Sequence, residues 1–176
     1  MKFISKQQDR WHMAAGEDGP IQHPLPAPCQ LLTLEQWRVV RDTWPPDLPI
    51  GVIVPNDVDI ETIEEDLPRL QLVALHFPKW VDGRAYTQAH ILRARFRYPG
   101  EVRATGEVLV DMLPLMKRTG FDAVVLRGDQ KMEHAERALN FFPGHYQGDV
   151  REYRPLFSRP ANEVATREFV QQGAAI

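Results

Sequence analysis

The stretch Ile50-Gly51-Val52-Ile53-Val54 decides the fold, because it is an unbroken apolar run rich in β-branched residues. Three further strand-like runs follow it, at Leu72–Leu75, Glu101–Ala104 and Ala123–Leu126. Strands that are apolar throughout need cover on both faces, which is typical of a parallel sheet whose strands are joined by helices. The run at Ile50 therefore predicts the first strand of a parallel sheet.

Each of these runs is followed by a helical pattern. Behind the first run, Ile60, Ile63 and Leu67 are spaced at i, i+3 and i+7 among acidic residues, which predicts an acidic helix with one buried stripe. Behind the second run, Ala85, Ala89, Leu92 and Phe96 mark the side of a helix that packs against the core. The fourth helix is expected around Met132 to Phe141.

The third helix is disturbed by Pro114. A proline inside a helix removes a hydrogen bond and bends the helix, whereas a proline in the first turn costs little. The favoured solution is a helix that begins late, with Asp111 as its cap and Pro114 in its first turn.

Four β/α units over residues 50–148 predict an α/β domain with a parallel sheet. Two arrangements fit this pattern, an open flavodoxin-like sheet or half of a β/α barrel. A half barrel leaves an open edge and an apolar interior, which gives it a reason to form a homodimer. Residues 149–176 are polar and predict a C-terminal tail.

Residues 1–49 contain seven of the fifteen prolines, which predicts an irregular N-terminal arm. Within it, the segments Lys2–Gln7 and Arg10–Ala15 favour a small hairpin. One short helix is expected after Thr33, because Thr33 and Gln36 have the spacing of a capping box.

Composition excludes several classes of protein. The 176 residues suffice for one domain with arms, and 21 basic against 24 acidic side chains give a net charge of −3, which argues against nucleic-acid binding. The single cysteine, Cys29, excludes an internal disulfide. No membrane span or signal peptide is visible, so we expect no membrane association and a cytoplasmic location.

The candidate site lies where the second strand meets its helix, because ligands bind at the carboxyl ends of parallel strands. Residues 79–103 carry six cations and two anions, and one helix face holds Tyr86, His90, Arg93 and Arg97. Such a patch predicts binding of an anionic ligand or a partner protein. The chosen residues are Lys79, Trp80, Asp82, Gly83, Arg84, Tyr86, Gln88, Arg93 and Asp111.

A purely structural interpretation stands beside this one. An arginine-rich helix face is usually solvated or pairs with an acidic helix such as the one at 57–66. Asp82 is then a plain helix cap, and Trp80 packs against a neighbouring segment.

Motifs for common chemistries are absent from the sequence. There is no G-x-G-x-x-G, no Walker A pattern, no H-E-x-x-H and no G-x-S-x-G, and the six histidines are scattered. The residues therefore predict no metal site, and they identify neither a cofactor nor a catalytic group.

The segment Phe77–Ala89, which reads FPKWVDGRAYTQA, resembles a bacterial family of domains of unknown function, as does the segment Gly100–Leu109. Members of that family are named as oxidoreductases of sulfite reduction and tend to be encoded beside assimilatory sulfite reductase. The resemblance covers about Ile50 to Gln147. Trp80, Ala85 and Pro114 depart from the family's usual residues.

The resemblance implies a pathway rather than a mechanism. One hypothesis is an accessory protein of sulfate and sulfite assimilation that binds sulfite reductase, another protein of that pathway or an anionic ligand. The alternative is a small-molecule oxidoreductase with a separately bound cofactor. A third treats the motif as the seam of a homodimer. All three stay open at this point.

Overall fold

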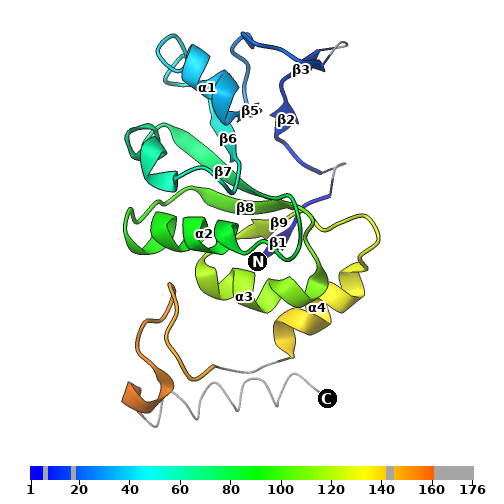
Figure 1. Ribbon diagram of the computed structural model, residues 1–176, viewed down its shortest axis with the longest axis vertical. Coiled ribbons are helices and arrows are strands. Elements are labelled where there is room, and N and C mark those ends of the chain that lie inside the picture. The colour runs from blue at the N-terminus through cyan, green and yellow to red at the C-terminus, as the bar shows by residue number, and fades with distance from the viewer. Residues whose placement is uncertain (6–7, 17–18, 142–144, 161–176) are drawn as a thin grey trace.

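The computed structural model of the protein describes residues 1–5, 8–16, 19–141 and 145–160. A seven-stranded sheet has the order β1-β9-β8-β7-β6-β5-β2, and all neighbouring strands are parallel (Figure 1). Its strands are β1 (Lys2–Phe3), β2 (His12–Met13), β5 (Gln30–Thr33), β6 (Ile50–Val54), β7 (Leu70–Phe77), β8 (Glu101–Gly106) and β9 (Ala123–Val124). A separate antiparallel pair joins β3 (Ala15–Gly16) to β4 (Gly19–Pro20).

Helices connect the central strands. Among the described residues, the α-helices are α1 (Leu34–Val40), α2 (Arg84–Ala94), α3 (Leu113–Thr119) and α4 (Met132–Asn140). The same residues also form three 3₁₀ segments, η1 (Ile60–Asp66), η2 (Val110–Met112) and η3 (Leu156–Ser158). Within the described ranges, none of the helices combines the length and the apolar character that crossing a membrane requires.

The strand order distinguishes the two predicted arrangements. From β5 to β9, each strand lies beside the next strand in the sequence, so the order never reverses. A flavodoxin-like sheet needs such a reversal, whereas a half barrel is a run of consecutive β/α units. The sheet is curled, and the fold is an α/β half barrel (Figure 1).

The sheet is buried on both faces, as its apolar strands predict. On one face, Val73 and Leu75 of β7 join the main core with Ala89 and Leu92 of α2. On the opposite face, a second cluster consists of Trp11, Leu31, Leu72 and Ala74. We call the face of the sheet with Val73 and Leu75 the outer face, and the face with Trp11 and Leu72 the inner face.

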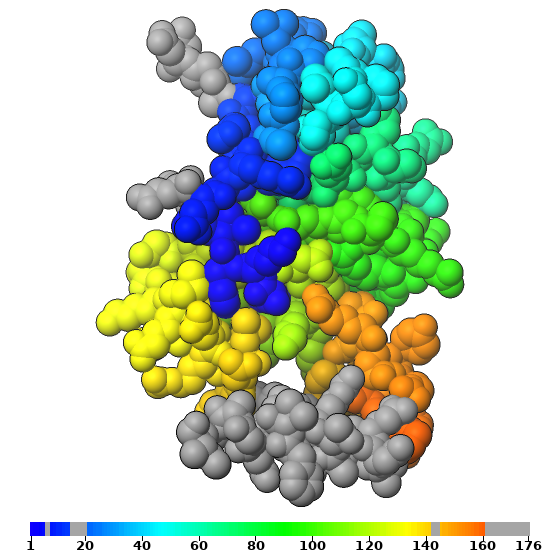
Figure 2. All heavy atoms as spheres, turned by 180° about the vertical axis from the view of Figure 1, so that it is seen from behind, coloured from blue at the N-terminus to red at the C-terminus, as the bar shows by residue number. Residues whose placement is uncertain are grey.

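The N-terminal segment crosses the inner face. β1 pairs with β9 at one edge of the sheet, and β2 pairs with β5 at the other edge. Figure 2 shows this segment lying over the sheet from behind. The hairpin expected of Lys2–Gln7 and Arg10–Ala15 is therefore wrong, because the strands of its two arms pair in parallel with different partners. Residues 6 and 7 of that range lie outside the described residues.

Residues 30–44, within the predicted arm, contribute to the same sheet and core. Thr33 caps α1 with a complete capping box, since its hydroxyl accepts from Gln36 N at 3.2 Å and the Gln36 amide accepts from Thr33 N at 2.8 Å. Trp37 and Trp44 are fully or almost fully buried in the main core. The short helix expected after Thr33 is therefore confirmed.

The third helix begins late, as expected, with Pro114 in the first turn of α3. The expected cap is wrong, because Asp111 lies inside η2 and the residue before α3 is Met112. The acidic helix behind the first strand forms as the 3₁₀ segment η1, with Ile60 and Ile63 buried.

Candidate functional site

Four loops meet at one rim of the half barrel. Because β6, β7, β8 and β9 are parallel neighbours, the loops after them lie at the same edge of the sheet. This rim carries Asn56 after β6, residues 78–83 after β7, Glu107 after β8 and Arg127 after β9. It is the edge at which β/α folds bind their ligands.

The loop between β7 and α2 has an exposed apolar tip. Trp80 is 54% exposed and Val81 is 66% exposed, and Lys79 beside them is exposed as well. The tip is closed by a turn in which Asp82 N donates to Lys79 O at 3.1 Å. An exposed tryptophan on a closed loop is the kind of residue that dominates the binding energy of a protein interface.

Asp82 and Arg84 form a bidentate ion pair at the start of α2. Arg84 Nε donates to Asp82 Oδ1 at 3.0 Å, and Arg84 Nη2 donates to Oδ2 at 2.7 Å. The Arg84 guanidinium holds the pKa of the Asp82 carboxyl well below its usual range. The residue that caps α2 is Gly83, so Asp82 is not the cap itself, although its Oδ1 accepts from Arg84 N at 3.3 Å.

Gln88 fastens the base of this loop to the neighbouring one. It is 5% exposed, and its Nε2 donates to Pro55 O and Val58 O, both at 2.8 Å. Asn56, which is also buried, helps to lower the pKa of Asp82. The first turns of α2 are therefore fixed to the loop after β6.

Tyr86 belongs to an aromatic cluster under the loop. Its ring lies edge-on to Phe77, with centroids 5.3 Å apart, and edge-on to Phe121 at 6.3 Å. Burial, together with the Asp111 carboxylate, raises the pKa of Tyr86 to about 12. Tyr86 thus supports the loop from below and keeps its proton at neutral pH.

Asp111, whose carboxylate helps to raise the pKa of Tyr86, also lines a cavity. The cavity holds about 420 Å³ and lies between the start of α3 and α4, where its lining residues are Asp111, Pro114, His134, Arg137, Ala138 and Phe141. His134 and Arg137 were not singled out from the sequence, because only the packing of α4 against η2 and α3 brings them near Asp111.

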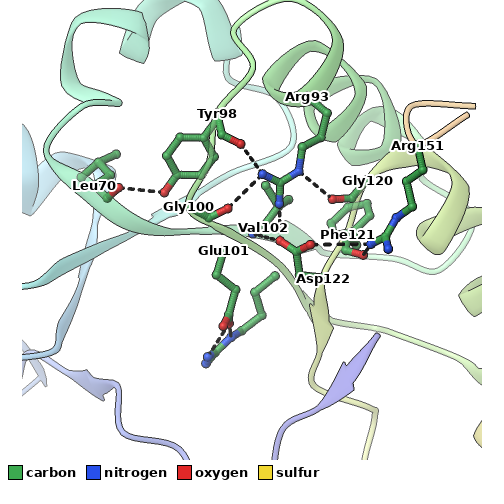
Figure 3. A network of polar contacts seen from close by, with 11 residues as sticks. Leu70, Arg93, Tyr98, Gly100, Glu101, Val102, Gly120, Phe121, Asp122 and Arg151 are labelled. Carbon is green, nitrogen blue, oxygen red and sulfur yellow. Dashed lines mark hydrogen bonds and ion pairs between the residues drawn. The ribbon is translucent and has the colours of Figure 1, made fainter. Parts of the chain in front are cut away.

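Arg93 serves as an internal brace (Figure 3). Its guanidinium donates to Gly120 O at 3.0 Å, to Gly100 O at 2.9 Å, to Tyr98 O and to the Asp122 carboxylate. All three of its nitrogens are engaged, so this side chain ties α2 to the loops before β8 and β9. It does not face the exposed tip with Trp80.

The six cations of residues 79–103 do not form one patch. Arg84, Arg93 and Arg95 are paired with Asp82, Asp122 and Glu61. Arg103 lies on the inner face, where it is almost fully buried. Arg95 of α2 pairs with Glu61 of the acidic segment η1. This is the pairing that the purely structural interpretation of the basic helix face predicts. The structure thus brings together Asp82, Gly83, Arg84 and Gln88, under a tip that carries Lys79 and Trp80.

A second ion-pair network at the rim was not predicted. Arg127 Nε and Nη2 bind Asp129 at 2.6 and 2.7 Å, and Arg127 Nη1 binds Glu107 at 2.8 Å. Arg127 lowers the pKa of Asp129 to about 2. The loops that hold these residues were recognised as rim loops, but the pairing between them depends on the register of β8 and β9.

The fold and the rim define an α/β half-barrel protein with an exposed apolar tip beside paired charges. Residues 51–157 match the family described as Bacterial protein of unknown function (DUF934), and the chain belongs to this family. The match agrees with the extent of the resemblance noted from the sequence. A search of curated proteins found no match.

Proposed function

We propose that the protein is a non-catalytic binding protein that docks a partner protein through the loop between β7 and α2. The exposed pair Trp80 and Val81 carries this proposal. Burying a tryptophan that is now half exposed contributes strongly to association. The loop beneath it is already held in place, so binding costs little further conformational entropy.

The base of the loop favours a protein partner over a small anion. The Arg84 guanidinium already has a bidentate carboxylate partner in Asp82, and Arg93 is used inside the fold. A free anion would have to compete with Asp82 for the start of α2. An apolar pocket on a partner, in contrast, would bury the Trp80 side chain and leave the ion pair of Asp82 with Arg84 intact.

The resemblance supports a place for this binding in assimilatory sulfite reduction. On this proposal the protein is an accessory factor in the bacterial cytoplasm, and its partner is sulfite reductase or another protein of sulfate assimilation. Nothing in the loop requires the factor itself to carry electrons.

The test is capture from the native bacterium, with the retained proteins identified by mass spectrometry. We expect the wild type to retain sulfite reductase or another sulfate-assimilation protein, and Trp80→Glu to lose it. Val39→Glu on α1 is the matched control, because Val39 is 53% exposed and far from the rim in sequence. Equal retention by the wild type and Trp80→Glu, or no sulfate-assimilation protein at all, would contradict the proposal.

A second candidate function is favoured by the cavity at Asp111. A hollow of about 420 Å³ lined by Asp111, His134 and Arg137 has the size of a small-molecule site. On this alternative the protein is an oxidoreductase of the same pathway that binds its cofactor there. Visible absorbance of the freshly purified protein that disappears in Arg137→Ala would favour it, and a colourless wild type would count against a flavin.

Homodimer formation through the same tip is the third candidate. If two copies bury their Trp80 side chains against each other, sedimentation of the wild type shows a dimer and Trp80→Glu a monomer. A wild type that is monomeric at all accessible concentrations removes this candidate and leaves the docking proposal intact.

A further inference from the structure

The cavity between the start of α3 and α4 is lined by side chains of both charges. Asp111 belongs to η2, which follows β8, whereas His134 and Arg137 belong to α4, which follows β9. The packing of α4 against η2 brings these groups to one cavity. The other lining residues are apolar, namely Pro114, Ala138 and Phe141. A volume of about 420 Å³ is that of a small-molecule site.

The charged groups of this cavity do not pair with one another. In the part of the chain that the structure describes, neither His134 nor Arg137 forms an ion pair with Asp111, and the Asp111 carboxylate accepts no hydrogen bond. Arg137 Nη2 does bind Glu133 Oε1 at 3.2 Å, but Glu133 does not line the cavity. That pair is about three-quarters exposed at both side chains, so it contributes little and leaves the guanidinium available to a ligand.

Opposite charges that line one cavity without pairing are complementary to a ligand that carries both charges itself. An ammonium group would donate to the Asp111 carboxylate. A carboxylate would accept from Arg137 in the bidentate geometry that a guanidinium favours, and from the imidazole N–H of His134. The apolar part of the lining leaves room for a hydrocarbon side chain. We infer that the cavity binds a free α-amino acid with an apolar side chain.

The charge balance of the cavity disfavours a phosphate or a sulfate. Asp111 and Arg137 cancel each other, so a ligand without net charge fits best, whereas an anion of charge −2 would bring uncompensated charge beside a carboxylate. The inference does not depend on docking through Trp80. It also gives the cavity a different occupant from the cofactor of the second candidate function.

The test is isothermal titration calorimetry of the full chain with L-leucine, L-methionine and L-phenylalanine as probes. For the probe that binds most tightly, the N-acetyl derivative removes the ammonium and the α-carboxamide removes the carboxylate. We expect each derivative to bind at least about tenfold more weakly than its parent, because each loses a charge-assisted hydrogen bond. Glycine, which has no apolar side chain, is also expected to bind at least about tenfold more weakly.

Variants assign each group of the ligand to a residue. Asp111→Asn should weaken binding of the amino acid at least about tenfold and leave binding of its N-acetyl derivative unchanged. Arg137→Gln should weaken both and leave binding of the carboxamide unchanged. Glu133→Gln is the matched control, because it removes the partner of Arg137 outside the cavity, and it should bind no more weakly than the wild type. Circular dichroism establishes that each variant is folded.

Three outcomes would overturn the inference. They are the absence of saturable binding for all three probes, equal binding of the amino acid and its N-acetyl derivative, and a coloured cofactor in the purified protein that Arg137→Ala loses. Trp80→Glu should bind the amino acid as the wild type does. The docking proposal and this inference can therefore fail separately.

Discussion

At the scale of single residues, the arginines of this protein differ according to what surrounds them. Arg93 is only 16% exposed and holds three backbone carbonyls and one carboxylate, whereas Arg95 on the same helix is 59% exposed and makes one surface pair with Glu61. Sequence spacing alone cannot separate these roles, because both residues lie in one basic stretch.

Replacement of Arg93 is therefore expected to destabilise the fold rather than only alter binding. Arg93→Ala takes the guanidinium donor away from three backbone carbonyls and removes one of the partners of Asp122, and we expect a loss of about 2–4 kcal/mol of unfolding free energy. Arg95→Ala, the matched control, should change it by no more than about 0.5 kcal/mol. Urea unfolding of the two variants measures both values. Similar losses for the two would show that Arg93 is not a brace.

Tyr86 provides a pH-dependent prediction. Its pKa is raised to about 12 by burial and by Asp111, so the folded state holds the phenol proton more tightly than the unfolded state, with its ordinary pKa of 10. The stability from this shift is fully present below pH 10 and is lost as the pH rises through about 12. Near neutral pH, Tyr86 is protonated in both the folded and the unfolded state, so it gives the stability no pH dependence there.

Asp111→Asn should lower the pKa of Tyr86, while burial keeps it above 10. Tyrosinate absorbance during an alkaline titration measures this, and Tyr86→Phe identifies which part of the signal belongs to Tyr86. An unchanged titration in Asp111→Asn would mean that the carboxylate does not face the phenol.

At the scale of elements, α3 shows how a proline can be accommodated. Pro114 lies in the first turn, where its missing N–H has no partner to lose. We expect Pro114→Ala to change the unfolding free energy by less than about 0.5 kcal/mol, whereas Lys117→Pro, in the last turns of the same helix, costs about 3 kcal/mol. Thermal or urea unfolding distinguishes the two. A large loss in Pro114→Ala would show that the proline has a further role.

The central elements were predictable because their signals are local. Ile50–Val54 is a strand by its β-branched residues, and Thr33 with Gln36 fixes the start of α1 through contacts three residues apart. The edge strands β1 and β2 were not predictable. Each has two residues, and each depends on a partner far along the chain.

The candidate site was predictable in its location but only partly in its contacts. The rim follows from the parallel sheet, and the pair of Asp82 with Arg84 lies within three residues. The role of Arg93 and the cavity at Asp111 depend on how helices pack, which periodicity does not report. The choice between a half barrel and a flavodoxin-like sheet depends on strand order, and no residue pattern encodes that order.

At the scale of the whole molecule, the predicted division at residue 49 has a direct test. Trp11, Trp37 and Trp44 lie before that boundary and are at most 5% exposed, while Trp80 beyond it is 54% exposed. Tryptophan fluorescence therefore reports mainly on residues 1–49, and far-ultraviolet circular dichroism reports on the whole chain. Because β5 and α1 share the main core, we expect the two urea transitions to coincide. Separate midpoints would show that residues 1–49 unfold independently.

The pairing of β1 with β9 has a consequence for biosynthesis. Lys2 leaves the ribosome before Ala123 and meets it only after about 120 further residues have been added. At bacterial elongation rates this takes on the order of 10 s, during which β1 has no β9 to pair with. Such long sequence separation slows folding, so the sheet of the half barrel is completed only late in translation. A chaperone that shields emerging apolar chains would find a long-lived target in the residues around β1.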